Sequence, residues 1–118
     1  MAENEGKVYI DWNDGIKRVM NNTALYTKLL NKFKASAGVN AGNLSTALDA
    51  GDYEKAQTEA HTLKGIAGNL SLTELYKQAL EVETQIKTRS VDPGAFESLN
   101  ACFTETIASI DKAIAEHA

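Results

Sequence analysis

The sequence has only one cysteine and one proline in 118 residues, and no apolar run long enough to cross a membrane. Its start, MAENEGK, lacks the apolar stretch of a signal peptide. Cys102 has no second cysteine with which to form an internal disulfide, and this suits a reducing compartment. We therefore expect a cytoplasmic protein that does not use a membrane as its partner.

Dense blocks of Lys and Arg are also missing, and the formal net charge is −4. Without such a block the chain is poorly suited to follow a phosphate backbone, which argues against nucleic acid as a partner. No glycine-rich loop precedes a Lys-Ser or Lys-Thr pair, and no carboxylate cluster suggests bound Mg²⁺. His61 has no second histidine at helical spacing. The sequence predicts no nucleotide site, no cofactor and no metal.

The residues that are abundant point to a folded helical domain. A content of 43% hydrophobic and 24% charged residues is ordinary for one globular domain of this length. Ala, Leu, Lys and Glu are common and β-branched runs are few, which favours helices over strands. Capping signals divide the chain into six helical segments, at about 11–20, 22–38, 40–51 or 43–51, 52–70, 72–87, and 93 to near the C-terminus.

Long amphipathic helices joined by short turns favour an all-α antiparallel bundle. The segments that meet near Gly38 are expected to form an antiparallel pair with a tight connection. In SLTE, Ser71 and Glu74 match a capping box that would start a helix near Leu72. We expect one domain over residues 1–118, with residues 1–9 as a flexible tail.

The segment 52–70 contains the candidate site. On a helical wheel its core face gathers Ala56, Ala60, Leu63, Ala67 and Leu70. His61 points away from that face, among Glu54, Gln57, Lys64, Gly65 and Gly68. Each interior glycine costs about 1 kcal/mol relative to alanine. The glycines either clear space for a group on the ring or for a partner, or they serve close helix packing, and many exposed histidines have no function.

The histidine face has the chemistry of a phosphoryl acceptor. Free histidine titrates near pH 6.5, so an exposed imidazole is largely neutral and nucleophilic at cytoplasmic pH. Lys64, one turn further on, could stabilise the negative charge of a phosphoryl group. Phosphoryl acceptance by His61 is the chemistry that this arrangement favours.

The stretch AHTLKGIAGNLSL, residues 60–72, resembles the signature of histidine-containing phosphotransfer (HPt) domains. That signature reads His, any, Leu, Lys, Gly, any, Ala, any, any, Leu, Gly. The stretches GIKRVMNNTALYTKLLNKF and ALDAGDYEKAQTEA resemble the family's usual approach to its histidine helix, so the resemblance covers about residues 11–87. Ser71 departs from the pattern, because the family commonly has glycine there.

The resemblance implies a four-helix bundle with a short additional N-terminal helix. It implies a phosphoryl carrier in a multistep phosphorelay, without a nucleotide site or independent turnover. The group would pass between His61 and aspartates of response-regulator receiver domains, including that of a hybrid histidine kinase, and the receiver would supply the metal. Lys64 would give electrostatic support and Gly65 would leave room for the phosphoryl group. By spacing, Glu83 would lie near the histidine, with Gln85 as a less favoured neighbour, although a carboxylate would repel a phosphoryl group.

A receiver would need a docking surface beside His61. We expect Trp12 and Ile16 on the first helix to contribute, together with Gln57 and Gly68. The alternative for Trp12 is that it covers the end of the bundle's core. Nothing in the sequence requires a dimer, so a monomer is expected.

Three other classes of protein compete with this interpretation. A histidine-kinase dimerisation domain normally follows its histidine with Glu and a later Pro, and HTLKG has neither. The phosphorylated domain at the start of a chemotaxis kinase has a similar fold, but a chain from Met1 to Ala118 without a linker favours a stand-alone carrier. The third is a non-catalytic helical bundle that binds partners through this face after losing phosphotransfer.

Overall fold

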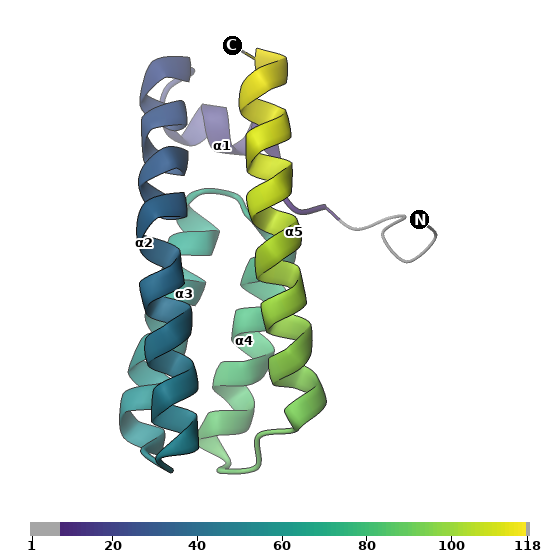
Figure 1. The fold of residues 1–118 in the computed structure, drawn as a ribbon. Coiled ribbons are helices and arrows are strands. Elements are labelled where there is room, and N and C mark those ends of the chain that lie inside the picture. Colours follow the sequence, from purple (N-terminus) through teal and green to yellow (C-terminus); the bar gives the residue numbers. More distant parts are fainter. Residues whose placement is uncertain (1–7, 118) are drawn as a thin grey trace.

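The computed structural model describes residues 8–117, which form five helices and no strand (Figure 1). The helices are α1 (Trp12–Arg18), α2 (Thr23–Asp49), α3 (Tyr53–Asn69), α4 (Thr73–Lys87) and α5 (Pro93–His117). The four long helices form an antiparallel bundle in which α3 packs against α2 and α4, and α4 packs against α5. Helices α2 and α5 extend beyond the turn between α3 and α4, and α1 lies across that end. The predicted bundle with a short N-terminal helix is confirmed.

Local capping signals set most of the helix starts. The side chains of Asp11, Asn22 and Asp52 accept hydrogen bonds from backbone N–H groups in the first turns of α1, α2 and α3. Pro93 is the first residue of α5, where its missing N–H costs nothing. Gly51 follows α2 with a φ of +72°, a backbone region that favours glycine. These predicted boundaries are confirmed.

The predicted break at Gly38 is wrong, because α2 is one continuous helix of 27 residues. A Cβ at Gly38 would meet nothing within 4 Å, so the glycine occupies an ordinary exposed helical position. Its intrinsic cost is only about 1 kcal/mol. Burial of Ala37, Leu44 and Ala47 on the core side outweighs that cost. The two predicted segments 22–38 and 40–51 are therefore one helix, and no antiparallel pair exists there.

The predicted capping box at residues 71–74 is also wrong. Helix α4 begins at Thr73, and its N-cap residue Leu72 makes no side-chain capping bond. Ser71 instead has a φ of +58° and donates its hydroxyl hydrogen bond to Asp14 of α1. Glycine adopts a φ of this sign without steric cost, whereas a residue with a Cβ does not. The backbone of Ser71 is therefore strained in the α3–α4 turn, while its side chain makes a contact with Asp14 of α1.

The predicted flexible tail covers residues 1–9, of which 1–7 lie outside the described residues. Val8 and Tyr9 are described, and both contact the bundle. The Val8 carbonyl accepts a hydrogen bond of 2.9 Å from the backbone N–H of Glu74, and Tyr9 packs half-buried against the core. The Asp11 N–H donates to the Ser71 carbonyl at 2.9 Å. The segment before α1 is thereby fastened to the α3–α4 turn.

Trp12 covers the end of the bundle, which is the structural alternative considered for it. Its ring lies 4.8 Å from the ring of Tyr26 in an edge-on arrangement and stacks on His117 at 4.1 Å. Gly15 lets α1 approach α2 closely, because a Cβ there would lie 2.1 Å from the Tyr26 hydroxyl oxygen. Ile16 also packs against the core while half-buried. Both apolar residues of α1 thus contribute to the fold.

Replacing Tyr26 by phenylalanine is expected to destabilise the fold by about 1–3 kcal/mol, because it leaves a buried acceptor without its donor. Tyr26 is fully buried and donates a hydrogen bond of 2.7 Å to the Leu70 carbonyl at the end of α3. Burial raises the pKa of Tyr26 to about 12. Urea unfolding followed by circular dichroism measures the loss. Tyr76→Phe, at a partly exposed position, is the control, and equal free energies of unfolding for the two variants would contradict the prediction.

Candidate functional site

His61 lies in the middle of α3 on its solvent face. Its side chain is 69% exposed. Ala56, Ala60, Leu63 and Ala67 are buried on the opposite side of the same helix. The core face predicted from the helical wheel is confirmed, and the imidazole is accessible to another molecule.

Antiparallel packing of α3 and α4 brings Glu83 next to His61. The His61 Nδ1 atom lies 3.0 Å from Glu83 Oε2, and the Glu83 side chain is only 3% exposed. The position of Glu83 agrees with the spacing in the sequence. Gln85, the less favoured neighbour, bonds to Glu81 and to the backbone N–H of Asp92.

Two lysines compensate the buried carboxylate. Lys64 Nζ lies 2.8 Å from Glu83 Oε1, and Lys87 Nζ lies 4.0 Å from Oε2. Oε1 is buried and receives no aligned hydrogen bond from the described residues, so the nearby ammonium balances its charge as an ion pair. Lys64 was expected to support a phosphoryl group, and in this structure it is held by Glu83. The ion pair between Lys64 and Glu83 was not predicted from the sequence.

The environment keeps Glu83 ionised. Burial pushes the pKa of Glu83 upward, but Lys64 and His61 outweigh it, so the pKa lies below its ordinary value. The contact with Glu83 in turn raises the pKa of Lys64. An ionised carboxylate only accepts hydrogen bonds, so the neutral His61 ring carries its proton on Nδ1. The lone pair is then on Nε2.

We expect the wild type to lose stability relative to Glu83→Gln as the pH falls below about 4.5, the ordinary value for this carboxyl group. A group with a lowered pKa in the folded state stabilises the fold above its unfolded pKa, and this stabilisation disappears as the pH falls through the folded pKa. Urea unfolding of both proteins between pH 7 and pH 3 measures the difference. A difference that stays constant over this range would contradict the lowered pKa.

The ring faces an open recess of about 520 Å³. The recess is lined by Glu54, Gln57, Thr58, His61, Thr62, Lys64, Glu83 and Lys87. Gln57, one of the expected partner-binding residues, is half-buried there, one helical turn before His61. The surface around the imidazole therefore has room for a group attached to the ring.

The two glycines after His61 have different surroundings. A Cβ at Gly68 would lie 3.3 Å from the Tyr76 ring, so this glycine allows α4 to place an aromatic side chain close to α3. A Cβ at Gly65 would meet nothing within 4 Å. Close helix packing, one of the two explanations considered for the glycines, accounts for Gly68. It does not account for Gly65, which has no structural compensation for its cost in the helix.

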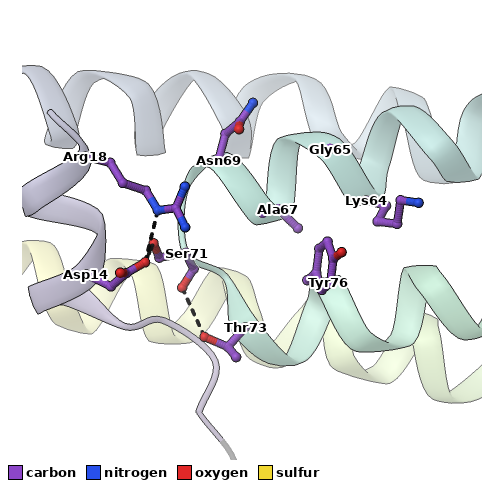
Figure 2. Close-up of a pocket in the computed structure, with 10 residues that line it drawn as sticks. Asp14, Arg18, Lys64, Gly65, Ala67, Asn69, Ser71, Thr73 and Tyr76 are labelled. Atoms are coloured by element: carbon purple, nitrogen blue, oxygen red, sulfur yellow. Dashed lines mark hydrogen bonds and ion pairs between the residues drawn. The ribbon is translucent and has the colours of Figure 1, made fainter.

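A second depression, of about 530 Å³, continues from Lys64 and Gly65 toward α1 (Figure 2). Tyr76 lies beside Lys64 at one end, and at the other end Arg18 contacts Asp14 at 3.0 Å. Tyr76 and Leu80 on α4 are 39% and 42% exposed, which is high for apolar side chains of this size. We call this depression the α1 groove.

In residues 8–117 no three His, Cys, Asp or Glu side chains lie together in a way that could hold a metal ion. In the same range no helix is both long enough and apolar enough to span a bilayer.

Comparison with known proteins identifies relatives of this chain. Residues 28–113 match the family model described as Hpt domain. No curated protein matches the chain closely enough in sequence to be reported as a relative. The fold is similar to the crystal structure of the HPT domain from a sensor hybrid histidine kinase from Shewanella. That match has a TM-score of 0.78 and 14% identity, and covers 92% of this chain and 95% of the other.

Proposed function

Because the chain belongs to the Hpt domain family, whose members act in histidine phosphotransfer, we propose that His61 is its phosphoryl-carrying residue. His61 would accept a phosphoryl group from an aspartate of one receiver domain and pass it to an aspartate of another. One observation carries the proposal: Glu83 holds Nδ1 of an exposed imidazole, and this leaves the Nε2 lone pair available. The reaction would take place in the cytoplasm and the carrier would be a monomer.

The proposed step is a displacement at phosphorus. The Nε2 lone pair forms the N–P bond as the bond between phosphorus and the aspartyl oxygen breaks, and the aspartate leaves as a carboxylate. Lys64, one turn from His61, would remain paired with Glu83, and its positive charge beside the site would stabilise the charge on the phosphoryl oxygens. Gly65 would leave room for the group or for the protein that delivers it. The receiver would supply the metal ion and most of the catalytic groups.

A receiver that reaches His61 would cover a much larger area. A standard interface buries about 800 Å² on each partner, which is enough to include the recess and the α1 groove. Gln57 lines the recess, and Gly68 and Tyr76 line the α1 groove, so all three would lie inside the interface. Leu80, an exposed apolar side chain one helical turn after Tyr76, would add an apolar contact. Trp12 and Ile16 would act through the position of α1, since both pack against the bundle.

Incubation with phosphoramidate, a small phosphoryl donor, tests the proposal. We expect the intact mass of the wild type to increase by one phosphoryl group and to return to its original value after mild acid. Receiver domains can then be screened for transfer from the labelled protein. A folded protein that takes up no phosphoryl group would favour the competing function, a bundle that binds partners without phosphotransfer.

A further inference from the structure

Glu83 faces the ring nitrogen that does not react. We infer that Glu83 keeps a proton on Nδ1 of the phosphorylated ring and so holds phosphohistidine 61 in the form that releases its phosphoryl group readily. This inference rests on the proposed phosphorylation of His61. It assigns to Glu83 a positioning role, because the carboxylate would act through the ring and would not touch the phosphorus.

The transfer step itself leaves a proton on Nδ1 of the product. The neutral ring attacks through Nε2 while Nδ1 keeps its hydrogen, so the product is an imidazolium that carries the phosphoryl group. If Nδ1 then loses that proton to solvent, the phosphorylated ring becomes neutral. Breaking the N–P bond of the neutral form expels an imidazolate anion, whereas breaking it in the protonated form expels neutral imidazole. The protonated form has the better leaving group and therefore transfers faster.

The contact between Glu83 and the ring also favours a proton on Nδ1. Glu83 Oε2 lies 3.0 Å from Nδ1, so an ionised carboxylate is already in place to hold a proton there. Lys64 binds the other oxygen, Oε1, at 2.8 Å and leaves Oε2 available to the ring. The side chain is 3% exposed, so little water competes for this hydrogen bond.

The remaining charged groups around the ring do not replace Glu83. The recess also contains Lys64 and Lys87, whose positive charges disfavour a second cation on the ring, and Glu54, which has no contact with either ring nitrogen. Among the described residues, Glu83 is thus the carboxylate that contacts Nδ1. A carboxylate at this position was expected to repel the phosphoryl group, but Glu83 contacts Nδ1, and the group would be attached to Nε2.

The test compares the wild type with Glu83→Gln after labelling with phosphoramidate. The glutamine amide can donate a hydrogen bond to an unprotonated Nδ1, so it removes the preference for the protonated ring. We measure the rate of phosphoryl loss between pH 6 and pH 9 from intact masses. For the wild type we expect a rate that changes little across neutral pH. For Glu83→Gln we expect a rate that falls with rising pH, to roughly one thirtieth of the wild-type value at pH 8, since free histidine titrates near pH 6.5.

Two further measurements separate this role from a structural one. Nitrogen-15 NMR of the labelled proteins at pH 8 should show Nδ1 protonated in the wild type and unprotonated in Glu83→Gln. Glu81→Gln is the matched control, because Glu81 is an exposed glutamate of the same helix that bonds to Gln85, and it should behave as the wild type does.

These experiments distinguish a failure of the inference about Glu83 from a failure of the proposed function. A wild type that takes up no phosphoryl group would overturn the proposed function, and the inference with it. A labelled wild type whose pH profile matches that of Glu83→Gln would overturn the inference alone. If Glu83→Gln does not fold, the wild-type profile decides, because a rate of phosphoryl loss that falls as the pH rises through neutrality would contradict proton retention by Glu83.

Discussion

Replacing His61 by glutamine is expected to abolish the uptake of an acid-labile phosphoryl group completely. Glutamine approximates the size of histidine and can form hydrogen bonds in its place, but its amide has no nucleophilic nitrogen lone pair. The side chain is 69% exposed, so the substitution should leave the stability of the fold almost unchanged. Intact mass after incubation with phosphoramidate measures the uptake, and circular dichroism confirms that the variant is folded.

The matched control for this variant is His117→Gln. His117 is the other histidine of the chain and stacks on Trp12 near the end of α5. The variant should take up the phosphoryl group as the wild type does. Among the described residues no carboxylate contacts the His117 ring, and His117 does not line the recess. Equal labelling of His61→Gln and the wild type would place the modified residue elsewhere. Loss of labelling only in His117→Gln would do the same.

Local signals predicted much of this fold because helix starts depend on neighbouring residues. Asp11, Asn22 and Asp52 each cap a helix through a backbone N–H three residues away, a relation that is visible in the sequence. Gly38 was misinterpreted because intrinsic propensity is a weak effect that burial along α2 overrides. Ser71 was misinterpreted because its partner, Asp14, is 57 residues away in the chain. No local pattern could show that contact.

The site was predictable to the same extent and for the same reason. The helical wheel placed His61 opposite the core, because that relation is internal to α3. The family spacing placed Glu83 near His61, although the ion pair between Glu83 and Lys64 depends on how α3 and α4 are rotated against each other. The difference between Gly65 and Gly68 has the same origin, since only the packed position of Tyr76 shows which of them is needed for the fold.

Replacing Gly65 by glutamine is expected to stabilise the protein by about 0.5–1 kcal/mol and to slow phosphotransfer from a receiver roughly 100-fold. The stability should rise because glutamine is a better helix former and a side chain at this position meets open space. Transfer should slow because the new side chain lies one turn from His61, where it keeps the aspartyl phosphate from close approach. Urea unfolding measures the first effect, and rapid-quench transfer from a phosphorylated receiver measures the second.

Gly38→Gln is the control for Gly65→Gln, because Gly38 is also a helical glycine whose Cβ would meet open space, and it lines neither depression. Gly38→Gln should gain as much stability as Gly65→Gln and should accept the phosphoryl group from a receiver at the wild-type rate. Phosphoramidate then distinguishes the two explanations for Gly65. If uptake from this small donor also falls, the space is needed by the phosphoryl group, whereas normal uptake assigns the space to the partner protein. Normal transfer from the receiver would contradict both explanations and leave Gly65 without a functional role.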